Sequence, residues 1–257
     1  MKNLFDLTGK VAIVTGASSG LGADAALAYA EYGADVALLA RRIDKLHDIA
    51  KKIEQLGRKA LPVQCDVSDE ESVKKAVEEV IACFGKVDIL LNNAGAAVRG
   101  SVETLSQEDW DKVMDVNVKG IYLVSKYVVP HMRAQKYGKI VNVASVNAIV
   151  ADKAPELTRH VYNTSKAAVR GLTMAMAASY MSDNITVNSI GPGLFESEMT
   201  TALFQHEGFL AMYNGLSPAG RPGKRNELNG TIIYLSSDAS SYVASQHIVI
   251  DGGFSIV

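Results

Sequence analysis

The amino-acid sequence predicts a doubly wound α/β fold in which helices cover both faces of a seven-stranded, mainly parallel sheet. Short and nearly continuous apolar runs alternate with stretches of helical length along the chain, as expected for parallel strands that are buried on both faces. A glycine-rich turn joins the first apolar run to the first helical stretch. The length of 257 residues suits one large core, so a single domain spanning residues 1–257 is expected.

The first elements follow one another as strand, glycine turn and helix. The apolar run at residues 11–14 stops at Gly16, and a helical pattern covers residues 21–32. A second strand at residues 35–39 and a second helix at residues 43–56 repeat the alternation. The further strands are expected at residues 59–64, 87–91, 139–143, 185–190 and 247–250.

Two prolines affect these elements. Pro62 lies in the third strand, where a residue without an N–H group is unfavourable unless the strand is at an edge. Pro130 lies near the end of a long helix expected at about residues 106–135, and it should kink or end that helix. A second long helix is expected at residues 162–181.

The composition favours small molecules as partners. A formal net charge of -2 gives no reason to expect nucleic acid or an anionic membrane. Only Cys65 and Cys83 are present, which is too few for a disulfide framework, and residues 1–10 do not resemble a secretory signal. No apolar run approaches the ~20 residues that span a bilayer. A cytoplasmic protein without a metal site is therefore expected.

The turn after the first strand has the composition of a phosphate-binding loop. Residues 15–22 read Thr-Gly-Ala-Ser-Ser-Gly-Leu-Gly. Glycines let backbone N–H groups approach a pyrophosphate, and a helix N-terminus favours its negative charge. A plain tight turn would use the same small residues, but the position between a strand and a helix is the one that a dinucleotide site requires.

Tyr162 and Lys166 are one turn apart in the predicted helix, so they lie on one face. An ammonium group beside a phenol favours phenolate, so we expect a lowered pKa at Tyr162 and proton exchange near neutral pH. Taken alone, such a pair is more often a packed ring beside a solvated amine. Its meaning depends on the other motifs.

Several motifs, in the same order along the chain, resemble those of the short-chain dehydrogenase/reductase family. They are the Thr-Gly-x-x-x-Gly-x-Gly spacing of residues 15–22, Asn92-Asn93-Ala94-Gly95, Asn117, Ser145, Tyr162-x-x-x-Lys166, Pro192-Gly193 and Asp251-Gly252-Gly253. The resemblance covers nearly the whole chain. It implies a Rossmann fold and hydride transfer between a nicotinamide and a secondary alcohol or ketone.

The resemblance also implies a role for each of four catalytic residues. Tyr162 would be the acid/base, and Lys166 would lower its pKa and bind the nicotinamide ribose. Ser145 would hold the substrate oxygen by a hydrogen bond, and Asn117 would anchor a water that connects the lysine to solvent. From the residues alone, Ser145 could simply end a strand and Asn117 could bind buried backbone.

The residues after the second strand favour NADP over NAD. An acid there would bind the ribose hydroxyls of NAD, whereas this chain has Ala40 followed by Arg41 and Arg42. A guanidinium binds phosphate by charge-assisted hydrogen bonds, although both arginines could instead be solvated at a helix start. Asp66 resembles the residue that contacts adenine, and Asn93 the one that stiffens the sheet beside the cofactor. The expected cofactor-binding residues are Gly16, Ser18, Ser19, Gly20, Leu21, Gly22, Arg41, Arg42, Asp66, Val67, Asn93, Ala94, Gly95, Tyr162, Lys166, Pro192, Gly193, Phe195 and Ser197.

Two segments are expected to select the substrate. Residues 146–161 are longer than is usual in the family, and residues 194–216 are expected to form a lid. The aromatic residues and methionines of the lid suit a bulky apolar substrate or a plain core, while Arg99 suits a carboxylate. The candidate substrate contacts are Arg99, Asn147, His160, Phe195 and Met199.

Residues 4–10, Arg99 and residues 217–223 are similar to those of gluconate 5-dehydrogenase-like members. The leading substrate is therefore a keto sugar acid. Hydroxysteroid (bile acid) dehydrogenases, 3-oxoacyl thioester reductases and a dinucleotide sensor without turnover remain alternatives. The family resemblance also implies a homotetramer or homodimer built through the two long helices.

Overall fold

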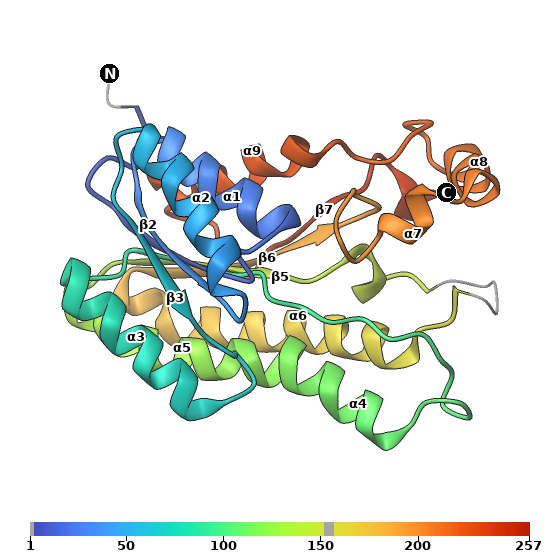
Figure 1. Ribbon diagram of the computed structural model, residues 1–257, viewed down its shortest axis with the longest axis horizontal. Helices are drawn as coiled ribbons and strands as arrows, with labels where there is room; N and C mark the ends of the chain where they lie inside the picture. The colour runs from blue at the N-terminus through green and yellow to red at the C-terminus, as the bar shows by residue number, and fades with distance from the viewer. Residues whose placement is uncertain (1–2, 152–156) are drawn as a thin grey trace.

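A computed structural model describes residues 3–151 and 157–257, and in this part of the chain seven parallel strands form one sheet (Figure 1). The strands are β1 (Val11–Thr15), β2 (Asp35–Ala40), β3 (Ala60–Gln64), β4 (Ile89–Asn92), β5 (Gly138–Val143), β6 (Ile185–Pro192) and β7 (His247–Ile250). Their order across the sheet is β3-β2-β1-β4-β5-β6-β7, which confirms the predicted fold class.

Helices cover both faces of the sheet. They are α1 (Gly20–Glu31), α2 (Ile43–Gln55), α3 (Glu70–Phe84), α4 (Gln107–Met114), α5 (Gly120–Gln135), α6 (His160–Tyr180), α7 (Thr201–Phe204), α8 (Glu207–Leu216) and α9 (Asn229–Ser236). Figure 1 shows α1, α2 and α9 on one face, α3 to α6 on the other, and α7 with α8 at one end of the molecule. Among the described residues, we find no helix with the length and apolar character needed to cross a membrane.

The central strand β1 is almost entirely apolar because both of its faces pack against helices. In β1, Ala12 and Val14 belong to the core cluster that contains buried residues of α1 and α9, such as Tyr29 and Ile232. Ile13 belongs to the other cluster, which includes residues of α3 and α5. Successive side chains of a strand point to opposite faces, so two buried faces require the continuous apolar run that the sequence shows.

The two prolines are accommodated in different ways. Pro62 pairs with Leu38 in β3, which is the edge strand of the sheet, and an edge is where a missing N–H is tolerated. Of the two effects predicted for Pro130, an end of the helix is wrong, since α5 continues to Gln135, and a kink stays a prediction. Val129 and Met132 are buried in the core on both sides of the proline, so tertiary packing holds the helix together.

The order of the strands determines where a binding crevice lies. The chain moves from β1 outward to β2 and β3, and then returns to β4 on the other side of β1. The connections therefore diverge at the carboxyl ends of β1 and β4. In open α/β sheets, ligands bind at this point.

Candidate active site

A cleft of about 610 Å³ lies along the carboxyl ends of the strands. Its lining residues come from the glycine turn, from the ends of β2 to β5, from the start of α6 and from the loop that follows β6. Those that the sequence predicted are Gly16, Ser18, Ser19, Gly20, Leu21, Arg41, Arg42, Asp66, Val67, Asn93, Ala94, Gly95, Ser145, Tyr162, Lys166, Pro192, Gly193, Phe195, Ser197 and Met199. The topology thus collects residues from distant parts of the sequence into one site.

The glycine turn is fixed to the end of β4. The side-chain amide of Asn93 donates to the carbonyl oxygen of Thr15 at 3.0 Å, and the Thr15 hydroxyl accepts from the backbone N–H of Asn93 at 3.0 Å. Gly22 does not line the cleft but packs beneath it. A Cβ atom there would lie 2.5 Å from the carbonyl oxygen of Gly16 and against the Asn93 amide.

The start of α1 is built to receive an anion. Its N-cap residue is Ser19, and no side-chain hydrogen bond caps this helix end among the described residues. The first N–H groups of a helix have no partner within the helix, and a phosphate can supply one. With the glycine cradle, these N–H groups fit the pyrophosphate of a dinucleotide.

We expect Gly22→Ala to destabilise the protein by about 1–3 kcal/mol, because the methyl group overpacks the turn. Thermal unfolding would measure this loss, and nucleotide titration should show weaker binding. Gly230→Ala is the matched control, since a Cβ at Gly230 meets no atom within 4 Å. Equal stability of the two variants would contradict the proposed packing.

The adenosine end of the cleft is basic. The Arg42 guanidinium donates from Nη2 to the hydroxyl of Ser18 at 2.9 Å and to that of Ser19 at 3.0 Å. Burial opposes ionisation of Asp66, yet hydrogen bonds from Ser68 and the charge of Arg41 together lower its pKa. The charge of Arg41 therefore acts on Asp66, whereas the Arg42 side chain is directed toward the glycine turn.

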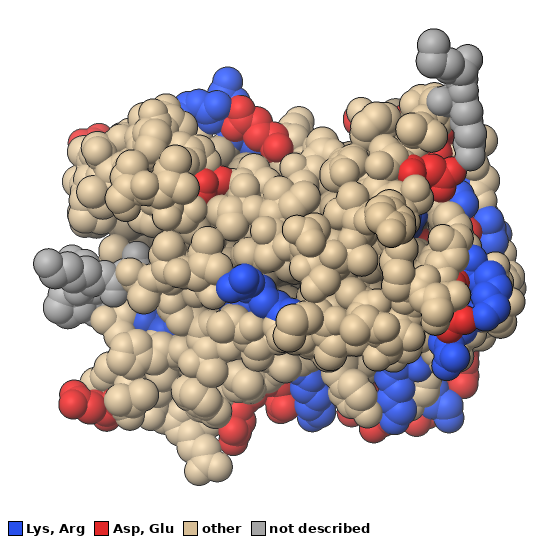
Figure 2. All heavy atoms as spheres, turned by 180° about the vertical axis from the view of Figure 1, so that it is seen from behind, with Lys and Arg blue, Asp and Glu red and all other residues tan. Residues whose placement is uncertain are grey.

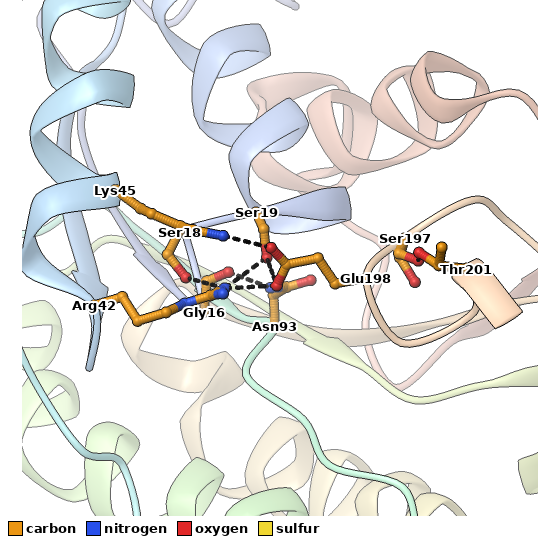
Figure 3. Close-up of polar contacts among 9 residues, drawn as sticks. All are labelled: Gly16, Ser18, Ser19, Arg42, Lys45, Asn93, Ser197, Glu198 and Thr201. Carbon is orange, nitrogen blue, oxygen red and sulfur yellow. Dashed lines mark hydrogen bonds and ion pairs between the residues drawn. The ribbon is translucent and has the colours of Figure 1, made fainter.

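A carboxylate occupies the space beside Arg42. Glu198 accepts from Nη2 of Arg42 at 2.8 Å, from Nζ of Lys45 at 2.7 Å and from Oγ of Ser19 at 3.0 Å (Figure 3). We call Ser18, Ser19, Arg42 and Lys45 the anion site. Neither Lys45 nor Glu198 was predicted from the sequence.

Ser145 and Tyr162 both line the other end of the cleft. The Ser145 hydroxyl also accepts from the backbone N–H of Asn147 at 3.1 Å, which fixes its orientation just after β5. Burial raises the pKa of Tyr162, although the Ser145 hydrogen bond and the charge of Arg159 act in the opposite direction. The expected lowering of this pKa is wrong for the protein without ligand, because desolvation outweighs the nearby charges.

Lys166 is buried behind this pair. Its Nζ lies 5.6 Å from the centroid of the Tyr162 ring and donates to the carbonyl oxygen of Val143 at 2.8 Å. Burial lowers the pKa of Lys166 to about 8. An ammonium group has three donors, and since Lys166 lines the cleft, its remaining N–H groups can reach a bound ligand.

Asn117 lies within a π-helical turn, Asp115–Lys119, between α4 and α5. Its side chain is fully buried, donates to the carbonyl oxygen of Ala96 and to the hydroxyl of Ser165, and accepts from the backbone N–H of Ala96. π-helical turns of this kind are frequent at functional sites. Asn117 therefore anchors the loop after β4 to α6, and it does not line the cleft.

Three of the candidate substrate contacts lie outside the cleft lining: Arg99, Asn147 and His160. His160 begins α6, and its Nδ1 accepts from the backbone N–H of Val102 at 3.0 Å. Asn147 accepts at its carbonyl oxygen from the side chain of Asn163, and Arg99 is exposed. These residues contact neighbouring loops, and their assignment as substrate contacts stays a prediction. The middle of the longer segment, residues 152–156, lies outside the described residues.

The residues that were not predicted differ in whether a local sequence pattern could have indicated them. Lys45 follows Arg42 by three positions, so helical spacing could have placed both on one face. Glu198 is far from both in sequence, and only the tertiary fold brings it there. Arg159, whose guanidinium carbon lies 6.0 Å from the centroid of the Tyr162 ring, gave no motif signal either.

Comparisons with known proteins agree with this geometry. A family model described as short chain dehydrogenase matches residues 10–208. Gluconate 5-dehydrogenase of Gluconobacter oxydans (strain 621H) is 38% identical over 254 residues, covering 99% of this chain and 98% of that protein. A 3-oxoacyl-[acyl-carrier-protein] reductase of Thermotoga maritima is 40% identical over 252 residues, covering 97% of this chain and 99% of that one.

Among solved structures, the chain is similar to a gluconate 5-dehydrogenase from Burkholderia cenocepacia J2315 in complex with NADP and tartrate. The TM-score is 0.94 at 35% sequence identity, and the match covers 99% of this chain and 98% of the other. At this level of similarity the two folds agree over nearly their whole lengths.

Proposed function

This chain belongs to the short-chain dehydrogenase family, and from that premise we propose that it is an NADP-dependent oxidoreductase for secondary alcohols and ketones, with a keto sugar acid as its leading substrate. The carrying observation is that Ser145, Tyr162 and Lys166 line one end of a cleft whose other end carries Arg41 and Arg42. A dinucleotide bound along this cleft would place its nicotinamide beside the tyrosine.

The bound nicotinamide would supply or accept the hydride. Tyr162 would hold the proton that the substrate oxygen gains on reduction, and its raised pKa keeps it protonated at neutral pH. Ser145 would donate to the same oxygen as negative charge develops on it. The positive charge of Lys166 would favour the phenolate that remains after transfer.

The choice of NADP rests on charge at the adenosine end of the cleft. β2 ends at Ala40, so no carboxylate follows it to bind ribose hydroxyls, and Arg41 and Arg42 both line the cleft. Guanidinium groups bind phosphate by charge-assisted hydrogen bonds. The similar gluconate 5-dehydrogenase structure contains NADP, which supports the same choice for this chain.

A keto sugar acid is supported by the relatives and by local charge. Two of the similar proteins are gluconate 5-dehydrogenases, one of them in complex with the dicarboxylate tartrate. In this chain the guanidinium of Arg159 lies near the Tyr162 ring, where positive charge suits an anionic substrate. Phe195 and Met199 also line the cleft, and with the similar 3-oxoacyl reductase they keep an acyl thioester as the second candidate.

A substrate panel would decide between these candidates. We expect NADPH oxidation with 5-keto-D-gluconate, with a lower kcat/KM for a 3-oxoacyl thioester and for a 3-oxosteroid, and a lower kcat/KM for NADH than for NADPH. Preference for the thioester would move the assignment to acyl reduction. Binding of NADPH without turnover of any ketone would favour a dinucleotide sensor.

We further propose that the whole chain is one domain, that residues 194–216 form a lid over the cleft, and that the protein is a cytoplasmic homotetramer or homodimer.

Tyr122 of α5 and Met174 of α6 are exposed apolar side chains on the two long helices. Figure 2 shows a face whose middle carries few charged side chains, while acidic and basic residues gather along its right and lower margins. Such surfaces suit self-association, and light scattering would measure the mass.

A further inference from the structure

Glu198 binds the anion site as a ligand would. One carboxylate oxygen accepts from Arg42 and Ser19 at 2.8 and 3.0 Å, and the other accepts from Lys45 at 2.7 Å. Figure 3 shows the Glu198 side chain directed away from its own loop, toward the glycine turn and the start of α2. The donors to Glu198 come from the glycine turn and from the start of α2, which are far in sequence from the loop that carries Glu198.

The loop that carries Glu198 has a defined shape and rests on the glycine turn. The Thr200 hydroxyl donates to the carbonyl oxygen of Phe195 at 2.6 Å and accepts from the backbone N–H of Ser197 at 2.9 Å. A Cβ atom at Gly20 would lie 3.2 Å from the Cβ of Ser197. The contact between Glu198 and the anion site therefore joins the loop after β6 to the glycine turn and to the start of α2.

A phosphate monoester has more charge and more acceptor oxygens for the same donors than a carboxylate has. It carries a charge of about -1.5 to -2 and three acceptor oxygens, against one charge and two oxygens on Glu198. Arginine, lysine and hydroxyl groups are common donors to either anion. The pKa of Glu198 is lowered to about 2, chiefly by the hydrogen bond from Arg42, so its carboxylate stays ionised at neutral pH.

We propose that Glu198 is a specificity-determining residue for the cofactor: in the free enzyme its carboxylate occupies the anion site, and a phosphate on the adenosine 2′-oxygen displaces it. This inference rests on the proposed use of NADP. A cofactor without that phosphate has no group to compete for Arg42 and Lys45. Glu198 would therefore lower the affinity for NADP, because its carboxylate must leave the anion site before the phosphate can bind there.

We expect the need to displace Glu198 to lower the affinity for a 2′-phosphorylated nucleotide by a modest factor. Arg42, Lys45 and Glu198 are all about half exposed, and exposed ion pairs are individually weak. We expect Glu198→Gln to bind adenosine 2′,5′-bisphosphate about 3- to 10-fold more tightly than the wild type, given the scale of a few such pairs. The affinity for 5′-AMP should change by less than about 2-fold, because it has no 2′-phosphate.

Calorimetric titration of both nucleotides would measure these constants without any catalytic step. Glu196→Gln is the matched control, because Glu196 is an exposed carboxylate on the same loop that does not line the cleft. Its affinity for either nucleotide should equal that of the wild type. Repetition with NADPH and NADH, followed by fluorescence, should give the same pattern with the complete cofactors.

Three results would overturn the proposal. Unchanged bisphosphate affinity in Glu198→Gln would show that the carboxylate does not compete. Weaker binding would show instead that Glu198 closes over a bound cofactor, and equal tightening toward both nucleotides would show an effect on the whole loop. If the wild type did not bind the bisphosphate, the NADP assignment would fail as well, whereas bisphosphate binding without ketone turnover would count only against the proposed reaction.

Discussion

Replacement of Tyr162 by phenylalanine is expected to lower kcat for ketone reduction by about 100-fold or more, which is the lower scale of positioned acid catalysis. The substitution removes the hydroxyl proposed to transfer the proton and leaves the ring that lines the cleft. NADPH affinity should stay within about 2-fold of the wild type, because the ring and Lys166 remain. Steady-state kinetics and fluorescence titration would measure the two quantities separately.

Tyr242→Phe controls for loss of a tyrosine hydroxyl elsewhere, since that side chain is 95% exposed. It should retain full turnover. If Tyr162→Phe kept near-native kcat, another group would have to supply the proton, and the assignment of Tyr162 would be lost.

Replacement of Lys166 by methionine should also lower kcat by about 100-fold, because the proton-transferring phenol loses the positive charge that favours its ionised form. Methionine fills similar space and has no donor for the carbonyl oxygen of Val143. The expected loss in folding stability is about 1–3 kcal/mol for that unpaired carbonyl, offset in part by removal of a buried charge.

The pH profile distinguishes a chemical role of Lys166 from a structural one. Its pKa of about 8 means that the ammonium is charged below that pH and neutral above it. In the wild type, kcat/KM for reduction should therefore be constant below about pH 8 and fall above it. The variant should lack this inflection while keeping a native circular dichroism spectrum. Lys75→Met, at a side chain that is 72% exposed, is the control.

Several features of the fold could be predicted because they depend on local pattern. The order of strands and helices follows from apolar runs, since a strand buried on both faces must be apolar along its length. The glycine turn could be assigned because its position between β1 and α1 restricts what it can bind. Ser145, Tyr162 and Lys166 followed from motif order, and the structure places all three in the cleft lining.

Other features depend on what surrounds a residue after folding. Lys166 alone predicts a lowered pKa at Tyr162, yet desolvation of the phenol raises this pKa instead. Proline alone predicts the end of a helix at Pro130, yet core packing carries α5 onward. His160 was a candidate for substrate contact from its closeness to Tyr162 in sequence, but its ring binds the backbone of Val102.

The amino-acid sequence by itself determined the fold class, the dinucleotide turn and the residues proposed for proton transfer, because each depends on side chains that are near one another in the chain or occur in a fixed order. Only the tertiary structure decided that Arg42, rather than Arg41, joins the glycine turn, and that Glu198 meets it there. The physical reason is that the strands of the sheet are parallel, so the loops after β1, β2 and β6 all begin at the carboxyl ends of their strands, on the same side of the sheet. Charges that are distant in sequence then lie within hydrogen-bonding distance.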